Sequence, residues 1–228
     1  MVAVENKKEM SRNIFIVLSA IFVASLVTCN LIVNKFVTID LGFKTFEISA
    51  GVLPYPITFL VTDILSEIYG RKKTNKVVFS GFIASLFVLL FLKLGAYFPA
   101  IEGSPLNNLE YDKVFGNSWR VIGSSMIAYL AAQFLDVKLF HFWKTLTKGK
   151  HLWLRNNAST IASQLTDTIL VTTILLIGVK SSSDIFSLII DGWLFKILCA
   201  AFDTPLFYLS TGYLRGLFDL ELGEEIQT

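Results

Sequence analysis

The sequence predicts an all-α, polytopic membrane protein with six transmembrane helices. Hydrophobic residues make up 54% of its 228 residues, and 20 residues are phenylalanine. The mean hydropathy of +0.61 is well above what a soluble domain of this size needs. Apolar segments of about 20 residues, the helical length that crosses a hydrocarbon core ~30 Å thick, recur along the chain.

The predicted spans lie near residues 13–34, 49–69, 77–99, 119–140, 155–178 and 187–210. The start of the first could pass for a signal peptide, but five more spans follow, so we interpret it as an uncleaved helix. The connections leave no room for a separate soluble domain. We therefore expect one integral membrane domain, residues 1–228, with membrane lipids around it.

The distribution of lysine and arginine predicts the orientation, because cytoplasmic segments carry the excess of basic residues. Twelve basic residues would be cytoplasmic and four external with the N-terminus inside. The cytoplasmic set is Lys7, Lys8, Arg12, Arg71, Lys72, Lys73, Lys76, Lys144, Lys148, Lys150, Arg155 and Arg215; the external set is Lys35, Lys44, Lys113 and Lys180. Both termini are therefore predicted to be cytoplasmic.

The composition argues against several other classes. The net charge is only +2, and the basic residues serve topology, so nucleic acid is not an expected partner. The two histidines, His141 and His151, lie in or beside a predicted cytoplasmic loop, where neither could be the base of an intramembrane protease. Cys29 and Cys199 are interpreted as packing residues, and no metal-binding motif or phosphate-binding glycine loop occurs. The sequence indicates a protein that is not an enzyme and needs no cofactor or metal.

The segment 49–69 is the most informative part of the chain, because it places Asp63 and Glu67 one turn apart in an apolar helix. An ionisable group at the bilayer centre costs at least ~2.5–3.5 kcal/mol, so such groups usually face a bundle interior or a cavity. Pro54 and Pro56 free backbone carbonyls, which is tolerated at membrane depth only inside protein or along a cavity. An alternative for Glu67 is an interfacial ion pair with Arg71. The segment is predicted to line a ligand or ion pathway.

Polar residues at helical spacing form stripes on four other spans. They are Asn30 and Asn34 in the first; Ser125, Tyr129, Gln133 and Asp136 in the fourth, with Gln133 as the candidate for binding; Asn157, Thr160, Gln164 and Asp167 in the fifth; and Lys196, Cys199 and Asp203 in the sixth. Amides, hydroxyls and acids suit a neutral ligand rich in hydrogen-bonding groups. The alternative is that the amides join helices, at about 0.6 kcal/mol per bond, and that Lys196 and Asp203 neutralise buried partners.

The two halves of the chain share a short similarity. VTDILSE at 61–67 and LTDTILV at 165–171 carry a Thr-Asp pair in the second helix of each three-helix half. Because each half has an odd number of helices, repeats would be inverted in the membrane. Inverted repeats that meet at a midplane site are a recurring plan of transporters.

Three segments together resemble a known family. The segments C-N-L-I-V-N-K (29–35), P-Y-P-I-T-F-L-V-T-D-I-L-S-E-I-Y-G-R-K-K (54–73) and S-Q-L-T-D-T (163–168), in a chain of this length, are similar to the queuosine precursor transporter family. The pattern T-D-x-x-x-E-x-Y-G-R-K is the specific part. The resemblance implies a protein of the bacterial inner membrane that imports a 7-deazaguanine base, such as 7-cyano-7-deazaguanine, 7-aminomethyl-7-deazaguanine or queuine, for tRNA modification.

A guanine-like base suggests roles for the polar residues. A carboxylate, Asp63 or Asp167, could accept from the donor edge of the base, and amides could satisfy its other polar atoms. An aromatic ring, Phe59 or Trp193, could stack on the base. The predicted substrate-binding residues are Asn30, Asn34, Phe59, Asp63, Glu67, Gln133, Asn157, Gln164, Asp167, Trp193 and Asp203.

Two alternatives stay open. One is the substrate-binding subunit of an energy-coupling-factor vitamin importer, which also has about six helices and no ATP site. The other is a structural or assembly protein, which would leave the buried acids unexplained. The precise base, the source of energy and the formation of a homodimer are open as well.

Overall fold

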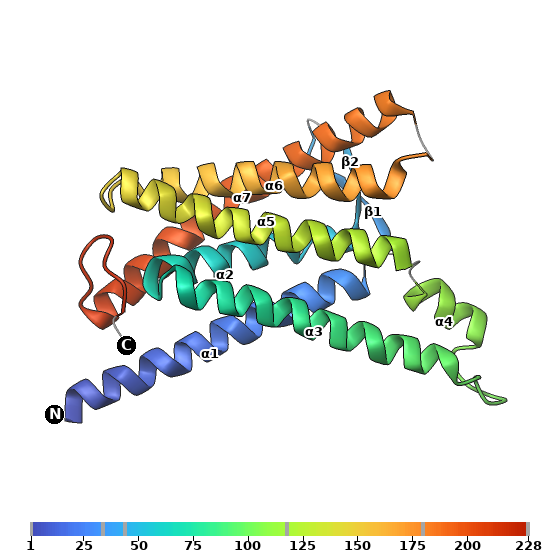
Figure 1. The fold of residues 1–228 in the computed structure, drawn as a ribbon, viewed down its shortest axis with the longest axis horizontal. Coiled ribbons are helices and arrows are strands. Elements are labelled where there is room, and N and C mark those ends of the chain that lie inside the picture. The colour runs from blue at the N-terminus through green and yellow to red at the C-terminus, as the bar shows by residue number, and fades with distance from the viewer. Residues whose placement is uncertain (1, 33–34, 43–44, 117–118, 179–180, 227–228) are drawn as a thin grey trace.

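The computed structural model describes residues 2–32, 35–42, 45–116, 119–178 and 181–226, and most of them are helical, as predicted (Figure 1). The elements are α1 (Val2–Leu31), β1 (Phe36–Asp40), β2 (Thr45–Ser49), a 3-10 turn η1 (Ala50–Val52), α2 (Tyr55–Ile68), α3 (Arg71–Tyr97), α4 (Asn108–Phe115), α5 (Trp119–Leu146), α6 (Leu152–Leu176) and α7 (Ser182–Phe218).

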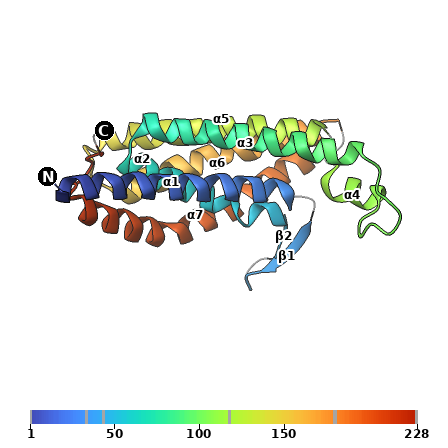
Figure 2. The ribbon, with the colours of Figure 1, turned by 90° about the horizontal axis from the view of Figure 1, so that it is seen from below.

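The long helices run side by side along one axis, and both chain termini lie at the same end of the bundle (Figures 1 and 2). We call this the terminal end; the opposite end carries α4. α2 is the central element, because it packs against α1, α3, α5 and α7. α5 packs along α6, and α6 along α7. The polar segment identified from the sequence therefore lies in the middle of the bundle.

α2 is short because local chemistry bounds it at both ends. Pro54 and Pro56 lie at its start, where a missing N–H is tolerated. Its last residue is followed by Tyr69 and by Gly70, whose φ of +80° is a conformation that L side chains rarely adopt. The 14 residues of α2 rise only about 21 Å, so the helix crosses a membrane core only together with η1 before it.

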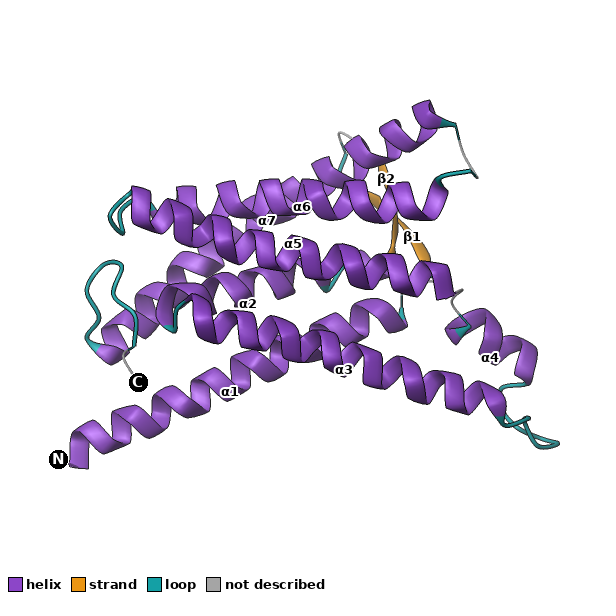
Figure 3. Ribbon diagram, in the orientation of Figure 1, coloured by secondary structure: helices purple, strands orange, loops and turns teal. Residues whose placement is uncertain are grey.

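The hairpin of β1 and β2 is a departure from the predicted all-α class (Figure 3). The strands pair antiparallel from Phe36 opposite Ser49 to Asp40 opposite Thr45. Phe46 stacks edge to face on Phe195 of α7, with ring centroids 5.2 Å apart. The signal was present in the sequence, because FVTID and TFEIS alternate β-branched or aromatic residues with polar ones.

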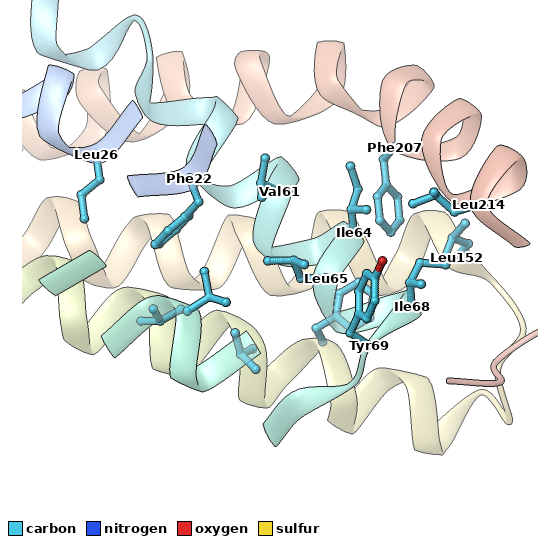
Figure 4. Close-up of a cluster of buried hydrophobic side chains, with 14 of the residues drawn as sticks. Phe22, Leu26, Val61, Ile64, Leu65, Ile68, Tyr69, Leu152, Phe207 and Leu214 are labelled. Carbon is cyan, nitrogen blue, oxygen red and sulfur yellow. The ribbon is translucent and has the colours of Figure 1, made fainter. Parts of the chain in front are cut away.

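The main hydrophobic core surrounds α2. Figure 4 shows Val61, Ile64 and Leu65 of α2 among side chains from α1 and α7, including Phe22 and Phe207. All five are at most 4% exposed. The apolar residues of α2 thus fix its position, while its polar residues lie buried on the remaining surface.

Each predicted span falls on a helix, although the bounds differ by several residues. Among the described residues, four segments are long and apolar enough to cross a membrane: Asn6–Leu31, Ala50–Ile68, Arg71–Tyr97 and Ser182–Phe218. The spans predicted at 119–140 and 155–178 fall on α5 and α6, which are outside this set. Large apolar side chains on the bundle surface, such as Leu90 and Phe202 at 63% and 77% exposed, suit contact with lipid. The chain is a multi-pass membrane protein, and the inverted relation of its halves stays a prediction.

Candidate functional site: a polar interior around α2

The interior of the bundle is polar over much of its length. On α2, successive turns contribute five buried polar side chains, each at most 1% exposed: Thr58, Thr62, Asp63, Ser66 and Glu67. The facing helices add further buried polar residues, which are Gln133 and Asp136 on α5 and Arg155, Asn156, Ser159, Thr160, Ser163, Gln164 and Asp167 on α6. Polar side chains buried beside the hydrophobic core of a membrane protein are costly, so their clustering places the candidate chemistry between α2, α5, α6 and α7.

Asp63 and Asp136 are buried carboxyl groups close enough to interact electrostatically. Thr160 donates to Oδ2 of Asp63 at 3.4 Å, and Ser163 donates to Oδ1 of Asp136 at 2.9 Å. The second oxygen of each carboxyl group has no hydrogen-bond partner among the described residues. Asp136 was not a predicted binding residue, although its three-residue spacing from Gln133 was a usable signal.

Gln133, in contrast, is already engaged by α2. Its Nε2 donates to the hydroxyl of Thr58 at 3.4 Å, and its Oε1 accepts from Thr62 at 3.3 Å. In this structure the amide therefore joins α5 to α2, which is the helix-joining alternative for a buried amide.

Glu67 is the centre of an ion-pair network near the terminal end. Its fully buried carboxylate accepts from Nη2 of Arg155 at 3.0 Å and also pairs with Arg215. Nζ of Lys144 lies 3.8 Å from the second oxygen and donates to the Glu67 carbonyl at 3.2 Å. Arg71, the partner in the alternative interpretation, is exposed on α3, and Glu67 pairs instead with residues of α5, α6 and α7. The network joins α2, α5, α6 and α7 through one side chain.

The C-terminal segment covers this network. Glu225 pairs with Lys144 at 3.0 Å, and the backbone N–H of Ile226 donates to the carbonyl of Ile68 at 2.8 Å. The segment passes so close to Gly70 that a Cβ there would overlap the side-chain carboxylate of Glu225. The polar interior is thus closed at the terminal end by side chains and by the tail.

A small cavity lies further along α2, toward its N-terminal half. Its aromatic wall is formed by Tyr55 and Phe59, and its polar wall by Gln164, Lys196 and Asp203, from α2, α6 and α7. Its volume of about 10 Å³ is close to the minimum that holds one water molecule. The Oε1 of Gln164 is buried without a hydrogen-bond partner among the described residues. The cavity therefore combines a hydrogen-bond acceptor that has no donor among the described residues with the aromatic rings of Tyr55 and Phe59.

Asp167 joins the cavity through Lys196. The Lys196 ammonium donates to the Asp167 carboxylate at 2.6 Å and to the Thr168 hydroxyl at 3.1 Å. It also lies 4.9 Å from the centroid of the Tyr55 ring. Lys196 therefore neutralises a buried acid. This agrees with the alternative interpretation of Lys196 from the sequence.

The structure brings Phe59, Gln164 and Asp203 together at the cavity, with Asp167 and Asp63 next to it. The other candidates among the described residues are not part of the cavity lining. The Asn157 amide bonds with Thr204, and the Trp193 indole donates to the Ile161 carbonyl at 3.0 Å. Asn30 is half-buried near the end of α1, and Asn34 lies outside the described residues. Tyr55 lines the cavity but was not among the binding residues predicted from the sequence.

A helical membrane protein whose buried polar residues meet at a cavity inside the bundle has the architecture of a solute transporter. Residues 49–210 match the family model described as putative vitamin uptake transporter. The chain belongs to the queuosine precursor transporter family, as its sequence resemblance predicted.

Three relatives show the extent of the similarity. The chain is 30% identical over 171 residues to a probable queuosine precursor transporter of Bacillus subtilis, covering 72% of this chain and 74% of the relative. It is 26% identical over 136 residues to the queuosine precursor transporter of Escherichia coli, covering 60% and 58%. It is 26% identical over 124 residues to a probable queuosine precursor transporter of Haemophilus influenzae, covering 54% and 50%. No solved structure matches the chain.

Proposed function

We propose that this chain imports a queuosine precursor, a 7-deazaguanine base, across the bacterial inner membrane. The proposal rests on the names of its relatives and on one observation in the structure, the cavity between α2, α6 and α7. The candidates for the base are 7-cyano-7-deazaguanine, 7-aminomethyl-7-deazaguanine and queuine. The relatives are named as transporters in their own right, which does not favour the importer-subunit alternative.

The cavity has the chemistry that such a base requires. Tyr55 and Phe59 offer ring faces on which a flat heterocycle can stack. Asp203 can accept hydrogen bonds from the N–H groups of the base, and so can the unpartnered Oε1 of Gln164. Lys196 can donate to a carbonyl oxygen or ring nitrogen. A purine-sized ring needs far more than 10 Å³, so in this proposal the chain without substrate is closed around the cavity, and α2 separates from α6 and α7 when the base binds.

The Glu67 network would close the pathway on the cytoplasmic side. In the proposed orientation the chain crosses the membrane six times, both termini are cytoplasmic, and the terminal end faces the cell interior. A substrate that leaves the cavity toward the cytoplasm must pass the buried ion pairs of Glu67 with Arg155 and Arg215. Release therefore requires these pairs and the tail contact at Lys144 to separate.

The test is rescue of queuosine formation. A bacterial strain that cannot synthesise 7-deazaguanines, and that lacks its own precursor transporter, is supplied with each candidate base at low concentration. Expression of this chain should restore queuosine in tRNA for at least one base. The variant Gln164→Leu should lower rescue tenfold or more, whereas Leu209→Ala on the exposed face of α7 should leave it unchanged. Absence of rescue for all three bases, with the chain present in the membrane, would contradict the proposal.

A further inference from the structure

A second and larger cavity lies outside the polar interior, between α1 and α3 at the terminal end. It is a groove of about 750 Å³, and its lining changes in character along its length. Toward the terminal end it is lined by Lys8, Arg12, Lys73 and Lys76, and further along by Phe15, Val23 and Val77. The groove shares Tyr69 with the end of α2 but no residue with the cavity at Phe59 and Gln164.

Defined contacts of Tyr69 hold the floor of the groove in place. The hydroxyl of Tyr69 donates to the carbonyl of Ser11 at 2.9 Å, which joins the α2–α3 turn to α1. Phe15 packs edge to face on the Tyr69 ring, with centroids 5.1 Å apart. Nζ of Lys73 lies 5.6 Å from the centroid of the same ring. One ring therefore positions both the cationic part and the apolar part of the groove.

The dimensions and charges of the groove fit one kind of ligand. Arg12 and Val23 are eleven residues apart on one helix, about 16 Å, which is about half of a ~30 Å hydrocarbon core, or one leaflet. At the Arg12 end of the groove the lining contains four basic side chains and a single carboxylate, that of Glu9. A molecule with a negatively charged head and an apolar chain one leaflet long meets both requirements. Basic pockets between transmembrane helices are typical sites for acidic lipid headgroups.

We propose that the groove between α1 and α3 binds an anionic phospholipid, with its phosphate among Lys8, Arg12, Lys73 and Lys76 and an acyl chain along Phe15, Val23 and Val77. The lipid bridges α1 and α3 and contacts Tyr69, two residues from Glu67. Its place is therefore next to the helix end that carries the ion-pair network, and the site is independent of which base the protein transports.

The test uses the full-length protein purified in detergent and native mass spectrometry with added phosphatidylglycerol or phosphatidylethanolamine. The wild-type protein should retain phosphatidylglycerol at least tenfold more than phosphatidylethanolamine. The variant with Lys8→Gln, Arg12→Gln, Lys73→Gln and Lys76→Gln should lose that preference. The matched control changes Arg71→Gln, Lys72→Gln, Lys148→Gln and Lys150→Gln, which are exposed and outside the groove lining, and it should keep the preference.

A second variant separates loss of binding from loss of folding. Val23→Trp leaves every charge in place and fills the apolar part of the groove, so it should reduce phosphatidylglycerol retention by tenfold while the melting temperature of the lipid-free protein changes little. Three results would overturn the proposal. They are equal loss of preference in the groove and control variants, unchanged retention in Val23→Trp, and a groove occupied by a second copy of the chain, seen as a dimer that only the groove variants dissociate.

Discussion

At the scale of single residues, Glu67 has the largest share of the charge interactions in the bundle. A fully buried carboxylate is costly in a low dielectric, and its ion pairs with Arg155 and Arg215 offset that cost. Such a pair contributes little net stability, but the removal of one partner leaves a buried charge unpaired. The partners of Glu67 come from three other helices, so these ion pairs are the contacts that must separate in the proposed release step.

The first prediction concerns Arg155. We expect Arg155→Met to lower the free energy of unfolding by about 3 kcal/mol, the low end for a broken buried pair, because Glu67 keeps Arg215 and Lys144 nearby. Thermal unfolding in detergent measures the effect. Arg71→Met is the control, because Arg71 is exposed on α3.

The triple variant Glu67→Leu, Arg155→Met and Arg215→Met tests the cause. It removes the carboxylate together with both of its guanidinium partners, while Lys144 keeps Glu225, so its melting temperature should lie above that of Arg155→Met alone. An equal or lower melting temperature would show that Arg155 stabilises the fold through its packing on Phe140, 5.6 Å from the ring centroid, and not through charge.

The second prediction concerns Asp63, which lies close to Asp136 and accepts from Thr160, a residue of the cavity wall. We expect Asp63→Asn to keep the protein in the membrane and to reduce uptake of the base tenfold or more, about 1.4 kcal/mol for a lost charge-assisted hydrogen bond. Initial rates of uptake in cells measure the effect, and Asp112→Asn on exposed α4 is the control. Wild-type uptake in Asp63→Asn would remove this residue from the transport mechanism.

At the scale of elements, the junction between α2 and α3 couples the centre of the bundle to the tail. Gly70 combines a φ of +80° and a ψ of 165° with the close approach of Glu225. Backbone of this kind is almost confined to glycine and costs about 1–3 kcal/mol for other residues. The junction therefore determines both the direction of α3 and the position of the C-terminal segment at Glu225 and Ile226.

The third prediction separates these two constraints. Gly70→Ala should lower the free energy of unfolding by about 1–3 kcal/mol through backbone strain. The contact of the new methyl group with Glu225 should add to that cost. Chemical or thermal unfolding followed by tryptophan fluorescence measures it. In a chain shortened after Glu221 the contact is absent, so Gly70→Ala should cost less there. An equal cost in both chains would mean that the tail does not press on Gly70.

The helices were largely predictable from the sequence, but their partners were not. Long apolar segments identified the regions of α1, α3 and α7 because a bilayer requires about 20 such residues in a row. The partners of Glu67 lie 88 and 148 residues away, and no local spacing contains that information. The hairpin was missed for a different reason: five-residue strands are short beside the apolar segments that dominate a hydropathy profile.

The candidate site divides in the same way. Asp63 and Gln164 were predicted as binding residues because polar residues at membrane depth are costly and therefore informative, and in the structure both are buried at the cavity or next to it. Tyr55 was missed, because an aromatic residue beside prolines at a helix start has no such signature. Trp193 and Asn157 were also predicted to bind the substrate, and in the structure they bond to neighbouring helices, because a side chain that can bind a ligand can equally join two helices.

At the scale of the whole molecule, buried and half-buried basic residues gather at the end of the bundle that carries both chain termini. Lys144, Arg155 and Arg215 gather at the terminal end with both chain termini, and α4 lies at the other (Figure 1). Both termini at one end is the arrangement that an even number of crossings produces. The contact between Gly149 and Gly223 places the α5–α6 connection at the terminal end as well. A chain with six crossings satisfies all of these positions.

The last prediction follows from that orientation. A reporter of sidedness inserted at residue 110 in α4 should be external, and one inserted at residue 148 in the α5–α6 connection should be cytoplasmic, because the excess of lysine and arginine stays inside. Alkaline phosphatase and green fluorescent protein fusions measure the two sides, since the first is active only outside and the second fluoresces only inside. A fusion at residue 222 is the reference for the terminal end and should agree with residue 148. If residues 110 and 148 report the same side, α5 does not cross the membrane. The proposed pathway past Asp63 and Glu67 would then have to be lined by other helices.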